Sequence, residues 1–424
     1  MNKLRQGFIH LIKHPLFTGG FILTISNLVA SASNYFFHLI TGRLLGPLQY
    51  SILASLISLS YFIGVVSAVF STSIMRQAAK FWAKEEKTKT IWFYREIFYQ
   101  VFIFSFVFLV FYLLSSSLIA DFLKINDKFL VWQMGIAGFL GLITITNFAF
   151  LQALLKFLYF GLLNFAGGVL KIVFILGLAF FGLNVTRSLW VLIISGAIVF
   201  VCSFLPLLRF DGKIFKLKEK FNFSFLHFWT NSIPVFLAVL GMTSLYTTDL
   251  ILVKHFLTDQ QTGLYSSLSV LGKIIFFASS PILIAMMPLI IKKKERGENF
   301  KKPFFFTLTF VFLCCLGFTL IYYLFPKLIL WLLYGEKFLA ASFLLGDFAV
   351  FISFYSLTNV FINFYIAIED NRIGFFPIIA ALIQIMCLSF FHHDLRQVIF
   401  ISIMTLAGLL ISLLIYFNYG KEKT

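Results

Sequence analysis

The chain has 424 residues, of which 60% are hydrophobic, 12% are charged and 59 are Phe, and its formal net charge is +17. Soluble domains contain roughly 45–50% apolar and about 25% charged residues. The composition therefore excludes a soluble globular protein, as well as disordered, collagen-like, coiled-coil and disulfide-rich classes. It predicts an all-α polytopic membrane protein. The four cysteines lie in apolar runs without the spacing of metal ligands.

About twelve apolar runs are long enough to form transmembrane helices, which need about 20 residues each. The first six are predicted at 17–40, 50–70, 97–119, 129–150, 157–181 and 189–208. The second six are predicted at 231–253, 266–291, 304–324, 342–366, 375–391 and 398–417. Transmembrane β-strands are excluded because the runs are too long and do not alternate with period two.

Lysine and arginine residues are concentrated in alternate loops. If the amino terminus is cytoplasmic, loops on that side hold roughly 24 of these residues and loops on the other side roughly 8, which is a strong positive-inside bias. We therefore expect a multi-pass protein of the cell (inner or plasma) membrane with both termini in the cytoplasm. Topology then accounts for the positive charge, so no nucleic-acid partner is expected. The first run continues to Ile40, which is too long for a cleaved signal peptide.

A charged segment near the middle, RFDGKIFKLKEK, separates the spans into two groups of six. It predicts an N-terminal lobe at 1–208, a cytoplasmic linker at 209–225 and a C-terminal lobe at 226–424. After the first helix of each lobe, a Gly-containing turn leads into Tyr-Ser, at Tyr50-Ser51 and at Tyr265-Ser266. Repeats of this kind occur in transporters that bind substrate between their halves. We therefore expect two six-helix lobes around a central cavity.

Charged side chains inside spans cost roughly 3 kcal/mol each on insertion scales, so each is a functional candidate. Lys171 and Lys273 lie within predicted spans, and Arg43 and Lys254 lie where the first span of each half ends. The alternative for these side chains is that they reach the lipid headgroups with their ammonium or guanidinium groups.

Acidic residues are nearly absent from the predicted spans. The first six contain none, and the second six contain only Asp249 and Asp347, both near predicted outside ends. Each could couple transport to an ion, cap a helix, or pair with Lys254 or Lys337. A cavity lined in this way would be net cationic, which favours an anionic ligand such as a phosphate or pyrophosphate over a cationic drug.

Uncharged polar residues at membrane depth could line the same cavity, although hydrogen bonding between helices is the more common use; the candidates are Asn34, His38, Asn147 and Asn363. The adjacent His392 and His393 cannot share one face of a short turn, so no metal site is expected. The sequence contains no phosphate-binding loop, GxSxG or HExxH motif. We expect no catalytic residues and no cofactor, and the chain is not predicted to be an enzyme.

Several of these segments resemble the polysaccharide exporters, which are lipid-linked oligosaccharide flippases of the multidrug/oligosaccharidyl-lipid/polysaccharide (MOP) flippase superfamily. The turn LLGPLQYS is similar to that family's LGPxxY pattern, and LLYGEKFLAA resembles its segment between helices nine and ten. The segment from the seventh to the eighth helix is similar in its prolines, its acid and its G-x-Tyr turn, here Pro234, Asp249, Gly263, Tyr265 and Pro288.

The resemblance implies a transporter that flips an undecaprenyl-pyrophosphate-linked oligosaccharide from the inner to the outer leaflet by alternating access. Its pathway would be the synthesis of a cell-surface polysaccharide such as lipopolysaccharide or capsule. Its partners would be the lipid-linked oligosaccharide, membrane lipids, and glycosyltransferases or a polymerase of the same pathway. Arg43 and Lys273 fall where related flippases carry cavity cations, and Lys171 is a looser match. Lipid II flippases usually carry two further helices, which are not found after Phe417.

Two other functions stay open on the sequence. A proton- or sodium-coupled multidrug exporter of the same superfamily would use acids within its helices, for which Asp249 is the candidate. A membrane glycosyltransferase or polysaccharide polymerase would need outside loops that carry acid and base groups, and the outside loops here are short.

Overall fold

The computed structural model describes residues 15–208, 221, 228, 233–296, 298–368 and 370–419. Helices make up every regular element among these residues, and none of the described residues lies in a strand. This confirms the predicted all-α class. The predicted linker 209–225 lies outside the described residues, except for Phe221.

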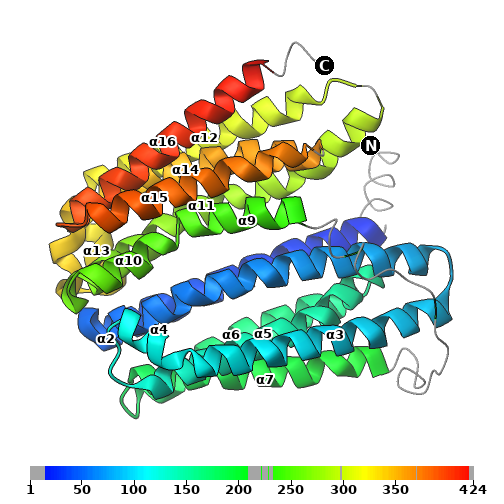
Figure 1. Cartoon of the computed structure of the whole chain (residues 1–424), viewed down its shortest axis with the longest axis horizontal. Helices are drawn as coiled ribbons and strands as arrows, with labels where there is room; N and C mark the ends of the chain where they lie inside the picture. Colours follow the sequence, from blue (N-terminus) through cyan, green and yellow to red (C-terminus); the bar gives the residue numbers. More distant parts are fainter. Residues whose placement is uncertain are drawn as a thin grey trace, which may run out of the picture. The chain divides into compact units, whose positions relative to one another are not determined.

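The amino-terminal half consists of five long helices and the short α4, joined by short turns (Figure 1). They are α2 (Pro15–Ala83), α3 (Lys87–Leu114), α4 (Ser116–Phe122), α5 (Lys128–Ala153), α6 (Phe157–Ala179) and α7 (Val185–Leu208). Within this half, α5 packs against α3 and α7, and α6 packs against α7.

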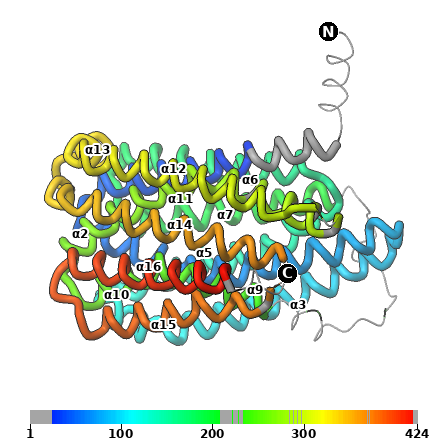
Figure 2. The backbone as a smooth tube through the Cα atoms, turned by 90° about the horizontal axis from the view of Figure 1, so that it is seen from above, coloured from blue at the N-terminus to red at the C-terminus, as the bar shows by residue number. Residues whose placement is uncertain are grey.

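The carboxy-terminal half has more short elements. They are α9 (Ile233–Leu245), α10 (Thr248–Phe256), α11 (Asp259–Glu295), α12 (Lys301–Leu324), α13 (Pro326–Tyr334), the 3-10 helix η1 (Glu336–Leu344), α14 (Leu345–Ala367), the 3-10 helix η2 (Asn371–Gly374), α15 (Phe375–Phe390) and α16 (Leu395–Tyr419). Figure 2 shows α12, α14, α16 and α15 as adjacent, roughly parallel rods, and α14 also packs against α11.

Ten of the described helices are long and apolar enough to cross a membrane, and α9 with α10 adds an eleventh as one span bent by 43°. The remaining difference from the twelve predicted spans lies in α2. This helix contains Gly46 in a non-helical conformation (φ 71°, ψ 174°), followed by Pro47. Proline cannot continue the hydrogen bonding of the preceding turn, so α2 divides there into two segments that match the first two predicted spans.

Some helices extend beyond the apolar runs that predicted them. The helix α3 begins at Lys87 rather than at 97, and α11 covers Asp259–Glu295 rather than 266–291. Hydropathy falls where charged residues begin, but Lys, Arg and Glu are good helix formers. The charged ends therefore stay helical outside the apolar section.

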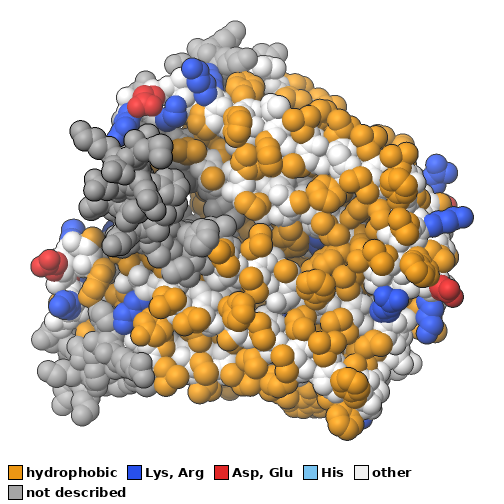
Figure 3. All heavy atoms as spheres, turned by 180° about the vertical axis from the view of Figure 1, so that it is seen from behind, with side chains coloured by type: hydrophobic (Ala, Val, Ile, Leu, Met, Phe, Trp, Pro, Cys, Tyr) orange, Lys and Arg blue, Asp and Glu red, His pale blue; other side chains and the backbone are white. Residues whose placement is uncertain are grey.

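Large apolar side chains are exposed along most of these helices. On α3, Phe102, Phe106 and Phe111 are all exposed. Figure 3 shows hydrophobic side chains across the middle of one face, with Lys and Arg mainly toward its two ends. A soluble protein rarely exposes so large an apolar surface, and this distribution is that of a multi-pass membrane protein.

The chain divides into two compact units. The first comprises Met1–His38, Val66–Ser117 and Lys128–Trp229, and the second comprises Leu39–Val65, Leu118–Asp127 and Thr230–Thr424. Two short segments from the amino-terminal half, 39–65 and 118–127, thus group with the carboxy-terminal helices. The predicted lobes 1–208 and 226–424, with the linker 209–225 between them, stay a prediction.

Phenylalanine forms much of the core of each unit. In the first unit, the Phe93 and Phe150 rings lie with centroids 6.0 Å apart in a buried cluster. In the second unit, the ring centroid of Phe304 lies 4.5 Å from that of Phe364 and 5.2 Å from that of Phe417. Aromatic pairs at these separations add to the energy of burial.

The two turns that resemble each other in sequence meet within the second unit. A Cβ atom at Gly263 would lie 2.1 Å from the carbonyl oxygen of Pro47, so this backbone contact requires glycine. The tyrosine after each turn, Tyr50 and Tyr265, is fully buried. The hydroxyl oxygen of Tyr50 lies 3.4 Å from that of Tyr334, and Tyr265 donates a hydrogen bond of 2.6 Å to Asp249.

Candidate functional site

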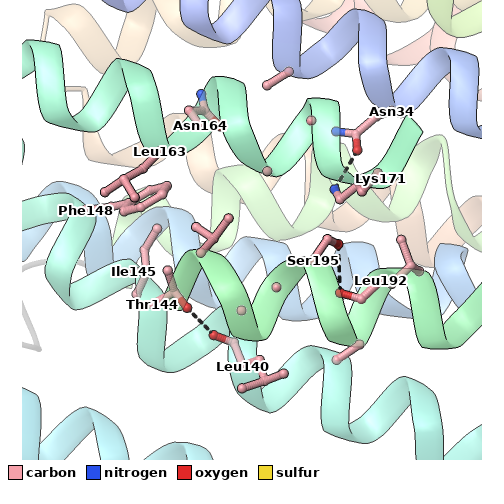
Figure 4. A pocket seen from close by; sticks show the side chains of 17 residues that line it. Asn34, Leu140, Thr144, Ile145, Phe148, Leu163, Asn164, Lys171, Leu192 and Ser195 are labelled. Atoms are coloured by element: carbon pink, nitrogen blue, oxygen red, sulfur yellow. Dashed lines mark hydrogen bonds between the residues drawn. The ribbon is translucent and has the colours of Figure 1, made fainter. Parts of the chain in front are cut away.

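A pocket of about 330 Å³ lies inside the first unit, between the amino-terminal part of α2 and helices α5, α6 and α7 (Figure 4). This volume is at the lower end of the range of small-molecule sites, about 300–1,000 Å³. Four glycines contribute to its walls, which lets the pocket reach the helix backbones: Gly141, Gly167, Gly168 and Gly196. Lys171 is the only charged side chain among the described residues that line it.

Two polar contacts join α2 to α6 along this pocket. The ammonium of Lys171 donates to the side-chain oxygen of Asn34 at 2.9 Å, and the amide of Asn164 donates to Asn27 at 2.9 Å. Between them, a Cβ atom at Gly168 would lie 2.7 Å from the Ser33 hydroxyl oxygen, so the two helices are in close contact. Residues three and four apart share one helix face, which brings 164, 168 and 171 to the same side of α6.

The second unit holds the other lysine at membrane depth in an aromatic setting. The ammonium of Lys273, on α11, lies 4.4 Å from the ring centroid of Tyr61 and 5.1 Å from that of Tyr246. Tyr246 in turn packs against Tyr355, with centroids 5.0 Å apart. Lys273 is 9% exposed and forms no ion pair within the part of the chain that is described. Cation–π contacts of this kind are worth about 0.5–2 kcal/mol.

The predicted pairing of Asp249 with Lys254 is wrong. Lys254 is fully buried, forms an ion pair with Asp259 and donates to the Ser51 hydroxyl oxygen at 3.4 Å. Asp249 is also fully buried, but it accepts hydrogen bonds from the Tyr265 hydroxyl at 2.6 Å and from the Leu250 backbone at 2.8 Å. Two residues five apart on α10 point about 140° away from each other, because each residue turns the helix by about 100°.

Asp347 and Arg43 also make contacts that the sequence did not indicate. Asp347 accepts a hydrogen bond of 2.8 Å from Tyr323 and lies 4.0 Å from the guanidinium of Arg396, so the predicted pair with Lys337 is wrong. Arg43 is exposed and donates to the carbonyl oxygen of Leu332 at 3.1 Å, near the end of α13. Basic side chains at a helix end commonly bind such free carbonyl groups. A role for Arg43 as a cavity cation stays a prediction.

The predicted uncharged lining residues are separated by the structure. Asn34 lines the pocket of the first unit. Asn147 is buried away from it, accepting from Tyr94 and donating to Ser203, both at 2.7 Å. Asn363 donates to Asn359 within α14 at 3.0 Å. His38 stacks edge-on against Phe37, with ring centroids 6.0 Å apart.

The structure thus brings together two of the predicted site residues, Lys171 and Asn34, and leaves Lys273 in the other unit. Sequence reasoning missed the tyrosines Tyr61 and Tyr246, because nothing in the local pattern links residues so far apart in the chain. The neighbouring Gly167 and Gly168, one turn before Lys171, were the available signal for the pocket. Among the described residues, no group of three or more His, Cys, Asp or Glu side chains could hold a metal ion.

No protein-family model matches the chain, and no curated protein matches it in sequence. Solved structures are similar in fold. An inward-facing multidrug resistance MATE family transporter of the MOP superfamily has a TM-score of 0.75 and 13% identity, over 93% of this chain and 94% of that one. The lipid II flippase MurJ, in an inward closed conformation, has a TM-score of 0.70 and 15% identity, over 94% of this chain and 87% of MurJ.

A third similar structure is a MOP superfamily transporter from Pyrococcus furiosus, described as having a binding pocket of reverse polarity that suggests a different function. Its TM-score is 0.61 at 13% identity, over 96% of this chain and 93% of that one. These identities show a shared fold. The chain has the architecture seen in MOP superfamily transporters, which agrees with the superfamily expected from the sequence. The specific family within it stays a prediction.

Proposed function

We propose that the protein is a flippase that carries the anionic head group of a lipid-linked oligosaccharide across the membrane. The observation that supports this proposal is the state of two lysines at membrane depth. Lys171 is held by a neutral amide and Lys273 by two aromatic rings, and neither forms an ion pair with a described carboxylate. Ionisable groups inside membrane segments are expensive and mark the paths of substrates and ions.

The sign of these charges favours an anionic substrate. A bound anion would stabilise each ammonium, whereas a cationic drug would be repelled by both. Lys273 is near enough to Asp249 to attract it, but the Asp249 carboxylate is already bonded to Tyr265. The similarity in fold to a lipid II flippase supports a lipid-linked substrate.

In this proposal the substrate is an oligosaccharide on undecaprenyl pyrophosphate, flipped from the inner to the outer leaflet of the cell membrane by alternating access. Lys273 and Lys171 bind its charges, while the polyprenyl tail stays in the lipid. Both termini are cytoplasmic. Glycosyltransferases of the pathway supply the substrate, and a polymerase consumes it.

The test is translocation of a fluorescent polyprenyl-pyrophosphate-linked sugar in proteoliposomes that contain the purified protein. Lys273→Gln should lower the rate at least about 10-fold, because hydrogen bonds to a charged group are worth about 1.5–3 kcal/mol. Lys273→Arg should restore part of it. Lys327→Gln, an exposed lysine of the same unit, is the control and should leave the rate unchanged. Equal rates for the wild type and Lys273→Gln would remove the site, and no translocation by the wild type would remove the function.

A second candidate function is a cation-coupled multidrug exporter, which the full burial of the Asp249 carboxylate favours. Such an exporter needs a buried acid that exchanges its ion. Asp249→Asn keeps an oxygen acceptor for Tyr265 and removes the charge, so it should abolish efflux driven by a proton or sodium gradient. Gradient-driven efflux of a cationic dye by the wild type, without translocation of the lipid-linked sugar, would favour this function over the flippase.

A further inference from the structure

The pocket of the first unit presents hydrogen-bond donors that have no acceptor among the described residues. A lysine ammonium only donates, so Asn34 must turn its carbonyl oxygen toward Lys171, as Figure 4 shows. The amide nitrogen of Asn34 therefore points away from the carbonyl oxygen that faces Lys171, and it makes no hydrogen bond with a described residue. Two N–H groups of the ammonium also remain. This end of the pocket is therefore suited to an oxygen anion.

The charge of the pocket matches one negative charge. Lys171 is the only charged side chain among the described lining residues. A pyrophosphate diester carries two negative charges, and the second would be left without a counter-charge in an apolar setting, which is costly. A carboxylate carries one charge and has two oxygens, which the ammonium of Lys171 and the amide nitrogen of Asn34 can bind together.

The opposite end of the pocket offers an acceptor. Asn164 donates its amide to Asn27, and its carbonyl oxygen accepts from none of the described residues, so it can accept from a hydroxyl group of a ligand. Asn164 and Lys171 are seven residues apart on α6, or about 10 Å at 1.5 Å per residue. Figure 4 shows Asn164 at one end of the pocket, near Phe148 and Leu163, and Lys171 at the other.

The wall between these ends is open. Cβ atoms added at Gly141 and at Gly196 would meet no atom within 4 Å, although both glycines line the pocket. A flat ligand can therefore lie against the helix backbones. Phe148 adds an apolar surface of the kind on which the C–H face of a sugar ring packs.

From these features we propose that the pocket binds one acidic sugar of the transported oligosaccharide, a hexuronic acid. Its carboxylate binds to Lys171 and Asn34, and a hydroxyl group donates to Asn164. The proposal rests on the flippase function and narrows its substrate class to head groups that contain an acidic sugar. In this proposal, Lys171 binds the carboxylate of the sugar and not the pyrophosphate.

The first test is binding of free glucuronate and free glucose to the full-length protein in lipid nanodiscs, measured by saturation-transfer NMR, which detects weak binding. Glucuronate should bind at least about 10-fold more tightly than glucose. Lys171→Gln should remove this preference and Lys171→Arg should retain part of it. Lys156→Gln, at the start of the same helix and outside the pocket lining, should not change it.

A steric variant keeps the test valid if Lys171→Gln does not fold. Gly141→Ala with Gly196→Ala adds two methyl groups to the open space without a clash, so the protein should fold and bind glucuronate at least about 10-fold more weakly. Gly177→Ala is the matched control, because this glycine of α6 is equally open but does not line the pocket. Equal binding of the two sugars, or binding that ignores both the lysine and the glycine variants, overturns the proposal.

A translocation assay distinguishes a failure of the acidic-sugar site from a failure of the proposed flippase function. Two polyprenyl-pyrophosphate disaccharides are compared in proteoliposomes, one ending in glucuronate and one in glucose. Faster flipping of the acidic substrate, with the difference lost in Lys171→Gln, supports the acidic-sugar site. Equal flipping of both overturns that site and leaves the flippase function intact. If neither is flipped, the flippase function fails, and the glucuronate binding result alone decides whether the pocket is an acidic-sugar site.

Discussion

Gly263 is the position at which an added methyl group has the least room. A Cβ atom there would lie 2.1, 2.5 and 2.6 Å from the carbonyl oxygen, carbonyl carbon and Cα atom of Pro47. Non-bonded carbon atoms are most stable at about 3.5–4.0 Å. The atoms in the way belong to the backbone beside the Gly46 kink, so no side-chain rotation relieves the overlap. Gly263→Ala must therefore move α11 away from the second segment of α2.

The expected cost is that of overpacking a closely packed core, about 1–3 kcal/mol in the free energy of unfolding. A change from glycine to alanine within a helix also gains about 0.8–1.0 kcal/mol in helix propensity. Gly317→Ala, on α12, carries the same gain without a contact, because a Cβ atom there meets nothing within 4 Å. The difference between the two variants therefore measures the clash alone.

The measurement is heat denaturation of both variants in detergent, followed by the amount of monodisperse protein on gel filtration. Gly263→Ala should denature at a lower temperature than the wild type, and Gly317→Ala at the same or a higher temperature. If Gly263→Ala matches Gly317→Ala, the two turns are not in backbone contact, and the reasoning from the paired Gly-containing turns is wrong.

Two further stability predictions concern buried polar groups, and both use the same heat-denaturation measurement. Asp259→Asn should destabilise the protein by about 3 kcal/mol and Lys254→Met by less, because the side chain of Lys254 is 0% exposed and that of Asp259 is 45% exposed; the reverse order would contradict the ion-pair argument. Asn147→Ala should cost about 1–3 kcal/mol, because it leaves Tyr94 and Ser203 without their partner. Translocation per folded molecule should be unchanged in Asn147→Ala, and a selective loss of transport would return Asn147 to the substrate path.

Hydropathy was sufficient to predict the spans, because a membrane helix must satisfy its backbone internally and present apolar side chains to lipid. It did not predict the break between α9 and α10 at Tyr246 and Thr247. The side chains there are apolar or small, so hydropathy does not fall at the bend. The short elements α4 and η1 were missed for a related reason, since neither is long enough to give a hydropathy signal of its own.

Side-chain partners were harder to predict than helices. The sequence suggested Asp249 for Lys254 because both lie near the end of one predicted span. The true partner, Asp259, lies at the start of the next helix, on the far side of a turn. Whether Asp259 reaches Lys254 depends on the direction in which α11 leaves that turn. Helix packing sets this direction, and the local sequence does not reveal it. The pairing of Lys171 with Asn34, 137 residues away, was out of reach for the same reason.

Three lysines in or at the end of the predicted spans provide a comparison within one chain. Lys254 is fully buried and is neutralised by a carboxylate and a hydroxyl group, so its charge is accounted for by the fold itself. Lys273 is 9% exposed and Lys171 is partly buried, and their partners are two aromatic rings and an amide. A fold that can place a carboxylate beside one buried lysine has no structural need to leave two others without an ion pair among the described residues. Under the proposed function, their counter-charge arrives with the substrate.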